Sequence, residues 1–176
     1  MFAGKTTWLI NYAKTLPFGS FRLFKPNVDT RYGKDHYVTH DGIQESAINI
    51  SVENPTFPDM DPRITTLLLD ELNFFSAETL LPAIQEQRAL GRTIVASGLM
   101  HDFAKKPFGA TPVFANIADT NIELFAICDS CGQNATHSYR KIQHTSQFML
   151  GAKELYGACC LTCWDRFNSL SSSSII

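Results

Sequence analysis

Three groups of residues in this chain have the side chains and spacings that chemistry requires. Gly4, Lys5 and Thr6 match the end of a phosphate-binding loop of the form G-x-x-x-x-G-K-[ST]. Asp70 and Glu71 follow an apolar run, and two C-x-x-C pairs lie near the C-terminus. These groups suit phosphate binding, metal-assisted or acid–base catalysis, and metal coordination, respectively.

The possible phosphate loop lies at the start of the chain. In such loops the glycine lets the backbone approach phosphate oxygens, the lysine neutralises charge on the outer phosphates, and the threonine hydroxyl binds Mg²⁺. The leading glycine would lie two residues before Met1, so we expect the loop and the strand that feeds it to be incomplete here. A plain helix-capping sequence is the competing interpretation of Gly4-Lys5-Thr6-Thr7.

The acid pair follows residues 64–69, Ile-Thr-Thr-Leu-Leu-Leu, a run typical of a buried parallel strand. In nucleotide-binding sheets an acid at the end of such a strand is the partner of Mg²⁺. A second acid beside it can take a proton from a hydroxyl nucleophile. The alternative is that Asp70 and Glu71 only begin a helix, where the dipole favours acids.

The cysteines form the most specific local pattern. Cys128 and Cys131 make one C-x-x-C pair, and Cys160 and Cys163 make another. Four thiolates form a closed tetrahedral Zn²⁺ site, which is structural rather than catalytic. Unmetallated buried cysteines are the alternative, and we expect Cys159 not to be a ligand.

Aromatic residues in loops are a weaker signal. Phe103, Phe108 and Tyr156 lie near glycine or proline and could stack on a planar ligand. From the residues alone we favour the other interpretation, in which each anchors its loop to the core.

The pattern of elements indicates an α/β fold with a parallel sheet of the P-loop NTPase type, its first strand absent from the chain. A strand, a helix and a strand with short connections form a crossover unit. We expect helix 8–16 after the loop, strand 21–24, a long loop over 27–42, strand 64–69, helix 78–90 capped near Ser76 and stopped by Gly91, and strand 93–97.

We predict three regions: a nucleotide-binding domain over residues 1–120, a small zinc-ribbon-like subdomain over 121–167, and a disordered serine-rich tail over 168–176. The subdomain shows few helix signals and two strand-like pieces, 123–127 and 137–141. Apolar residues make up 44% of the chain and the formal charge is −2. The sequence has no apolar run of about 18 residues, so it predicts no membrane span. It has no excess of basic residues, so it predicts no nucleic-acid-binding surface. Without a secretory signal, we expect a cytoplasmic protein.

Taken in order, these parts resemble the type II thymidine kinases, which are zinc-containing cytosolic deoxynucleoside kinases. The resemblance runs from Met1 to about Cys163. It is carried by residues 1–6, 24–26, 29–32, 39–42, 70–75, 98–99, 102–103, 106–109, 128–131, Ser138, Arg140, Gly151, Tyr156 and 160–163.

The resemblance implies ATP-dependent phosphorylation of the 5′-hydroxyl of thymidine, giving dTMP. Glu71 would be the general base, and Arg31 would stabilise the transferring phosphoryl group. The residues implied around ATP and Mg²⁺ are Gly4, Lys5, Thr6, Thr7, Asp29 and Asp70.

The resemblance also implies a thymine site and an assembly. A lasso loop over about 143–156 would close over the base, and family members are typically homotetramers inhibited by dTTP. The implied partners are therefore ATP, thymidine and further copies of the chain, with no nucleic acid and no membrane. The residues implied at the base are Met1, Phe74, Phe103, Phe108, Ser138, Met149, Gly151 and Tyr156.

Three positions depart from the family pattern. Asn73 stands where a glutamine is usual, Met100 where an aspartate is usual, and Ala104 where an arginine is usual. None removes a named catalytic group. The alternative function is a catalytically impaired or truncated paralogue that binds nucleoside or associates with kinase subunits.

Overall fold

The computed structural model describes residues 1–29, 36–38, 44–141 and 155–172. The chain forms two compact units. We call residues 5–100 and 107–121 the sheet unit, and residues 1–4, 101–106 and 122–176 the cysteine unit. Two short segments, 1–4 and 101–106, therefore group with the C-terminal part of the chain, which no sequence pattern indicated.

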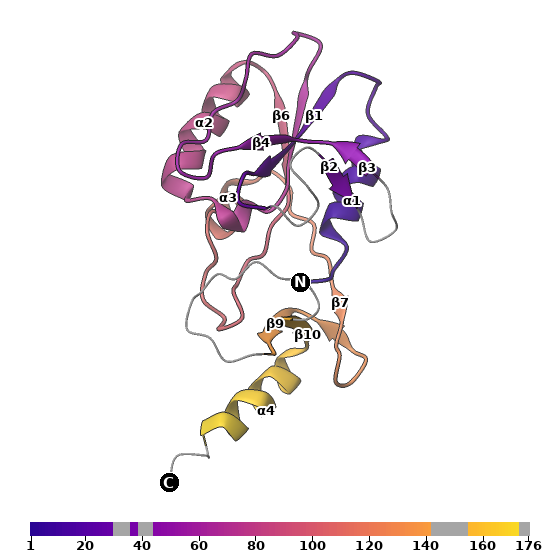
Figure 1. The fold of residues 1–176 in the computed structure, drawn as a ribbon, viewed down its shortest axis with the longest axis vertical. Helices are drawn as coiled ribbons and strands as arrows, with labels where there is room; N and C mark the ends of the chain where they lie inside the picture. Colours follow the sequence, from indigo (N-terminus) through magenta and orange to yellow (C-terminus); the bar gives the residue numbers. More distant parts are fainter. Residues whose placement is uncertain (30–35, 39–43, 142–154, 173–176) are drawn as a thin grey trace. The chain divides into compact units, whose positions relative to one another are not determined.

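The sheet unit is built on a four-stranded sheet in the order β4-β1-β5-β6 (Figure 1). All three neighbouring pairs are parallel, which confirms the predicted α/β class. The strands are β1 (Phe21–Pro26), β4 (Ile48–Ile50), β5 (Thr66–Leu69) and β6 (Thr93–Ala96).

Helices cover both faces of this sheet, with α1 (Lys5–Ala13) on one face and α2 (Ala77–Ala89) and α3 (Thr111–Ile117) on the other (Figure 1). Successive residues of a strand point to opposite faces. Leu68 accordingly joins the cluster of α1, whereas its neighbours Leu67 and Leu69 join the cluster of α2. All four residues of β5 are buried, as its continuous apolar sequence predicted.

The signals that were predicted to bound α2 are found in the structure. The Ser76 hydroxyl accepts a hydrogen bond of 3.1 Å from the backbone N–H of Glu78, which satisfies one free donor of the first turn. After the helix, Gly91 has a φ of 80°, a left-handed conformation that ends helices and favours glycine. No helix in the described part of the chain is long and apolar enough to cross a bilayer.

Several elements of the sheet unit differ from the sequence-based expectation. The long loop predicted over residues 27–42 contains strand β2 (His36–Val38), which pairs with β3 (Gln44–Ser46), so the prediction was wrong for those three residues. Residues 30–35 and 39–43 lie outside the described part. Strand β4, helix α3 and a 3₁₀ helix (Leu72–Phe74) were not predicted.

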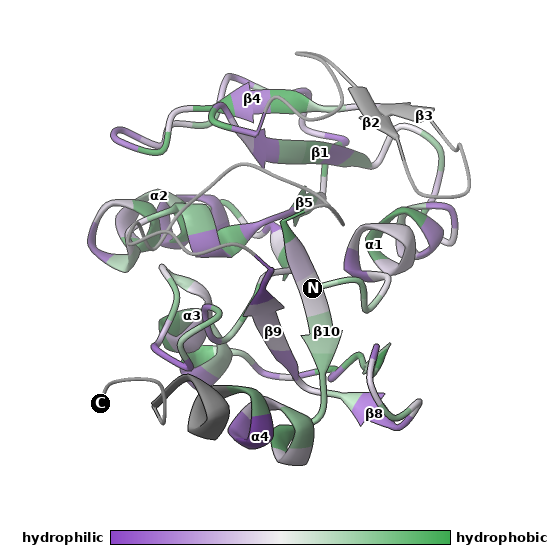
Figure 2. Ribbon diagram, turned by 60° about the horizontal axis from the view of Figure 1, so that its bottom comes forward, coloured by the Kyte–Doolittle hydropathy of each residue, from purple (hydrophilic) through white to green (hydrophobic). Residues whose placement is uncertain are grey.

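The described residues of the cysteine unit form two small antiparallel strand pairs and one helix. Strand β10 becomes more hydrophobic toward Cys159 (Figure 2). The helix α4 was unexpected, and it includes residues 168–172, which were predicted to belong to a disordered serine-rich tail. Residues 173–176 lie outside the described part. The elements are β7 (Ala126–Ile127) with β8 (Asn134–Ala135), β9 (His137–Arg140) with β10 (Tyr156–Cys159), and α4 (Leu161–Ser172).

Candidate functional site

The carboxyl edge of the sheet gathers several polar residues, and the sequence analysis had named two of them, Asp29 and Asp70. Asp29 lies just beyond β1, Asp70 directly follows β5, and Ser97 directly follows β6. Because β1, β5 and β6 are parallel neighbours, their carboxyl ends share one edge. Ligands of α/β sheets bind at this edge.

The possible phosphate loop and the acid pair meet here. Helix α1 begins at Lys5, so Thr6 lies in its first turn, where free backbone N–H groups favour anions. The Thr6 hydroxyl donates a hydrogen bond of 2.6 Å to Oδ2 of Asp70, although 64 positions separate the two residues. A hydroxyl and a carboxylate in contact offer two oxygen ligands of the kind that Mg²⁺ prefers.

Asp70 is buried, with 1% of its surface exposed, and both of its carboxylate oxygens accept hydrogen bonds. Oδ1 accepts from the Ser97 hydroxyl and, at 2.9 Å, from the backbone N–H of Glu71. Burial and the nearby charge of Glu71 raise the pKa of Asp70, while hydrogen bonds from Ser97 and Thr6 and the charge of Lys5 oppose that rise. Loss of solvent therefore disfavours the carboxylate unless a cation is bound beside it.

Sequence reasoning did not select Ser97. One available signal was its position directly after β6, next to the strand that ends at Asp70. The carboxyl ends of neighbouring parallel strands lie at the same edge of a sheet. A polar residue at the end of β6 is therefore a site candidate of the same kind as the acid at the end of β5.

Glu71 has an unusual backbone for a residue with a side chain, with φ 56° and ψ 47°. This left-handed conformation costs free energy in residues other than glycine, and such residues cluster at functional sites. The competing interpretation, a plain helix start, is met in part, because Glu71 is the N-cap residue of the helix that follows. Only a 3₁₀ helix follows, and no side-chain hydrogen bond caps it.

Asn73, which stands where a glutamine is usual in the family, has only one of its two amide atoms in a hydrogen bond among the described residues. Asn73 is buried, and its Oδ1 accepts a 3.0 Å hydrogen bond from the backbone N–H of Leu99. Among the described residues its Nδ2 has no partner. The adjacent Phe74 ring meets the Phe108 ring edge to face, with centroids 6.2 Å apart, so two residues implied at the base lie together.

The cysteine unit brings together four more of the residues implied at the base. The amino group of Met1 donates a 2.6 Å hydrogen bond to Oγ of Ser138. The Arg140 guanidinium lies 3.8 Å from the centroid of the Phe103 ring and donates a 2.9 Å hydrogen bond to the Tyr156 hydroxyl. Arg140 thus links Phe103 to Tyr156, a role that its place in a sequence motif did not reveal.

The cysteine sulfurs form a candidate metal centre. The Sγ atoms of Cys128, Cys131, Cys160 and Cys163 all lie within 4.8 Å of one another. Those of Cys131 and Cys160 are 3.6 Å apart. Zinc–sulfur bonds of about 2.3 Å in a tetrahedron place sulfurs about 3.8 Å apart, so the donor set fits zinc in both type and spacing.

The electrostatics of this cluster also fit a bound cation. Backbone N–H groups, that of Cys160 first, lower the pKa of Cys128 to about 6. Cys131 behaves in the opposite way: a backbone hydrogen bond from Gln133 favours its thiolate, but its contacts with the Cys128 and Cys160 thiols raise its pKa to about 12. Four such thiols cannot all ionise without a cation between them.

Cys159 is completely buried, and burial raises its pKa to about 11, so its thiol stays protonated at neutral pH. It is absent from the cluster of possible ligands, as expected.

The roles of all the predicted site residues stay predictions, and several of these residues lie outside the described part of the chain. Asp29 is buried and Thr7 is half-buried. Met100 and Ala104, two departures from the family pattern, are exposed. Arg31, Met149, Gly151 and most of the predicted lasso loop lie outside the described residues.

Comparison with known proteins places most of the chain in one family. The sequence model of the thymidine kinase family matches residues 1–164. The chain belongs to this family. It is 31% identical over 172 residues to a thymidine kinase of Pseudothermotoga lettingae, covering 96% of this chain and 92% of that protein. It is 34% identical over 170 residues to a thymidine kinase of Bacteroides fragilis, covering 94% and 83%, respectively.

Membership in the thymidine kinase family confirms the resemblance that the ordered motifs indicated. The matched region includes the Thr6–Asp70 contact and all four clustered cysteines. Both features of the structure therefore lie within the part of the chain that matches the thymidine kinase family.

Proposed function

We propose that this chain transfers the γ-phosphoryl group of ATP to the 5′-hydroxyl of thymidine, giving dTMP and ADP. The observation that carries the proposal is the hydrogen bond between Thr6 and Asp70 in a chain of the thymidine kinase family. The matched relatives are themselves named thymidine kinase. Phosphoryl transfer relies on positioning and charge neutralisation, and this site offers groups for both.

Six residues would hold the ATP phosphates and Mg²⁺. Gly4 and the first turn of α1 would direct backbone N–H groups at phosphate oxygens, and Thr7 lies in the same turn. Lys5 would neutralise charge on the outer phosphates. Thr6 and Asp70 would hold Mg²⁺, with Asp29 nearby at the same edge of the sheet. When bound, Mg²⁺ neutralises charge that builds on the phosphate oxygens.

Glu71 would act as the general base. As the thymidine 5′-oxygen bonds to the γ-phosphorus, its proton passes to the Glu71 carboxylate, and the bond to the β-phosphate oxygen breaks to release ADP. The left-handed backbone of Glu71 supports this role, because such strain is retained where function requires one orientation. Arg31 would stabilise the transferring group.

The thymine ring would contact a mainly aromatic set of side chains together with the lasso loop over about 143–156. Aromatic faces suit a planar base, and a few polar groups fix its orientation. The proposed contacts are Met1, Phe74, Phe103, Phe108, Ser138, Met149, Gly151 and Tyr156.

The remaining features of the proposal concern metal and assembly. Zn²⁺ bound by the four clustered cysteines would be structural, because four protein thiolates leave no position for substrate. By likeness to the family, we expect a cytoplasmic homotetramer that dTTP inhibits.

The decisive experiment measures transfer of labelled phosphate from ATP to thymidine by the wild-type chain and by Glu71→Gln. Loss of a general base typically costs about 10²–10⁴ in rate, so kcat should fall by that factor while ATP still binds. Glu78→Gln is a matched control, because Glu78 is an exposed acid of the same unit and should leave turnover unchanged.

Each outcome separates one part of the proposal. Full turnover in Glu71→Gln would overturn the assignment of the base. Thymidine binding without phosphoryl transfer in the wild-type chain would overturn the kinase function and favour a nucleoside-binding paralogue.

A further inference from the structure

The loop at residues 101–106 carries Phe103 and is closed by its own hydrogen bonds. Oδ1 of the buried Asp102 accepts from the backbone N–H groups of Ala104, at 2.8 Å, and Lys106, at 2.9 Å. The N–H of Asp102 donates to the carbonyl of Lys106 at 2.9 Å. Lys105 has a φ of 61°, so the turn forces a residue with a side chain into the left-handed region.

Helix α4 holds this loop at two places. Nε1 of Trp164 donates a 3.1 Å hydrogen bond to the backbone carbonyl of Phe103. The Lys105 ammonium lies 3.8 Å from the centroid of the Trp164 ring and 2.9 Å from Oδ1 of Asp165. One strained residue, Lys105, is thus fixed by both a cation–π contact and an ion pair.

The side chain of Phe103 is held separately. The Arg140 guanidinium stacks on its ring at 3.8 Å and is itself oriented by the hydrogen bond to Tyr156. Trp164 therefore fixes the backbone of Phe103, and Arg140 orients its ring. Neither interaction involves the strand pairing that builds the rest of the unit.

Trp164 is also tied to the candidate metal centre by the chain itself. Its neighbour Cys163 and the preceding Cys160 are two of the four clustered cysteines, and Trp164 donates its backbone N–H to the carbonyl of Cys160 at 2.9 Å. The helix turn that holds the loop is the same turn that presents the second cysteine pair.

We propose that Trp164 is a positioning residue for thymidine binding, because it joins the turn of the second cysteine pair to the loop that carries Phe103. This inference rests on the proposed function, in which Phe103 contacts the base. The chemistry that carries it is the hydrogen bond from the indole to the Phe103 carbonyl and the cation–π contact with Lys105.

The alternative is that Trp164 only fills space. It is half-buried and also lies near His137, with ring centroids 6.3 Å apart. A residue that only fills space would, when replaced, weaken the unit as a whole and change every kinetic constant. A positioning residue would change the thymidine KM and leave the ATP KM unchanged.

The experiment compares Trp164→Phe and Trp164→Leu with the wild-type chain in its metal-loaded form. Trp164→Phe keeps a ring beneath Lys105 but loses the N–H donor, whereas Trp164→Leu loses both. We expect the thymidine KM to rise about tenfold in Trp164→Leu and less in Trp164→Phe, consistent with loss of one or two contacts. The ATP KM and kcat should change by less than about twofold.

A second measurement, amide hydrogen exchange, does not depend on enzyme activity. Amide hydrogen exchange at residues 101–106 should be faster in both variants, while bound metal per chain stays at the wild-type value. Phe167→Leu is the control, because it removes another aromatic ring of α4. The Phe167 ring packs on Tyr139, with ring centroids 5.3 Å apart, so this change should leave the exchange of the loop unchanged.

The outcomes separate this inference from the proposed function. Unchanged exchange at residues 101–106 would overturn the positioning role, as would faster exchange with an unchanged thymidine KM in an active enzyme. Parallel changes in all constants together with loss of metal would assign Trp164 a purely structural role. Lack of phosphoryl transfer by the wild-type chain would instead refute the proposed function, and the exchange data would still test the contact. If Trp164→Leu fails to fold, Lys105→Met together with Trp164→Phe provides the same test.

Discussion

The sheet unit and the cysteine unit achieve order by different means. The sheet unit buries large aliphatic and aromatic side chains on both faces of its sheet, among them Phe24, Leu67, Leu68 and Phe75. The buried cluster of the cysteine unit consists of small residues: Ala126, Cys128, Ala135, Ala158, Cys159 and Cys163. Hydrophobic stabilisation scales with apolar area, at about 25 cal/mol per Å². The comparison teaches that the sheet unit can rely on its core, whereas we expect the cysteine unit, with its small buried residues, to depend on a metal bound by its four clustered cysteines.

The largest expected effect follows from removing one candidate metal ligand. Cys160→Ala should abolish metal binding, which contributes about 10–16 kcal/mol in small zinc-folded peptides. The measured zinc content should fall from one ion per chain to none. Amide exchange should become fast in the cysteine unit, while residues 64–97 of the sheet unit keep their protection.

The neighbouring residue provides the matched control. Cys159→Ala changes a fully buried thiol that stays protonated, so it should keep the metal. Chelation of wild-type protein should reproduce the effect of Cys160→Ala without any substitution. Equal loss of protection in both units after chelation would contradict the comparison, because it would make the metal a stabiliser of the whole chain.

A second, smaller effect tests the core of the sheet unit. Leu68 lies on β5 and is completely buried in the cluster that includes residues of α1, so Leu68→Ala should lower the free energy of unfolding by about 2–5 kcal/mol. Urea unfolding followed by Trp8 fluorescence in a Trp164→Phe background reports this unit alone. Leu90→Ala, at a side chain that is 64% exposed, is the control and should change little. A change in metal content in Leu68→Ala would argue against independent stabilisation.

The same difference decides what the sequence could predict. Strand β5, strand β6 and helix α2 were predicted because apolar runs, β-branched residues, Ser76 and Gly91 leave a signal within one element. Strand β4 has only three residues, Ile48–Ile50, and is defined by its pairing with β1. Helix α4 was missed because its first turn lies within the second cysteine pair, where spacing suggested only a metal site.

The candidate site divides in a similar way. Lys5, Thr6, Asp70 and the cysteines follow known spacings, so their grouping could be predicted, and the structure brings Thr6 to Asp70. The role of Ser97 depends on which strands are neighbours, which spacing does not encode. The contacts of Trp164 with residues 103 and 105 depend on tertiary structure and have no motif at all.

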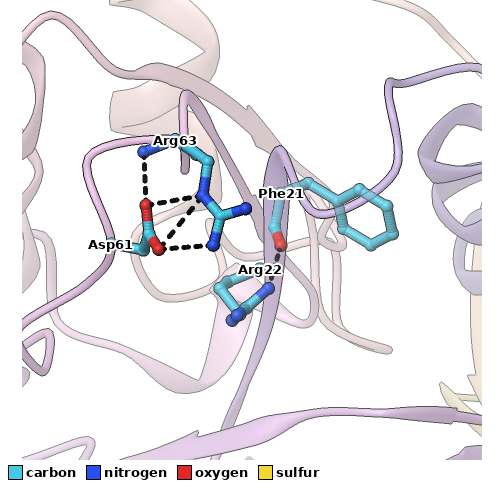
Figure 3. Close-up of polar contacts among 4 residues, drawn as sticks. All are labelled: Phe21, Arg22, Asp61 and Arg63. Atoms are coloured by element: carbon cyan, nitrogen blue, oxygen red, sulfur yellow. Dashed lines mark hydrogen bonds and ion pairs between the residues drawn. The ribbon is translucent and has the colours of Figure 1, made fainter.

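The smallest expected effect comes from a surface ion pair of the sheet unit. Asp61 accepts several hydrogen bonds from Arg63, with Arg22 nearby, and the side-chain bond from Arg63 lowers the pKa of Asp61 to about 2 (Figure 3). Because the ordinary value is 3.8, the pair stabilises the folded state above that pH, and this contribution disappears as the pH falls toward about 2.

Exposed pairs contribute little, so Asp61→Asn should lower the urea midpoint at pH 5 far less than Leu68→Ala does, and the difference should shrink by pH 2.5 and in high salt. Asp59→Asn, at another exposed acid of the same segment, is the control. A decrease as large as that of Leu68→Ala would mean that surface charge stabilises the sheet unit as strongly as its core does. The contrast between a unit stabilised by apolar packing and a unit expected to be stabilised by metal would then need revision.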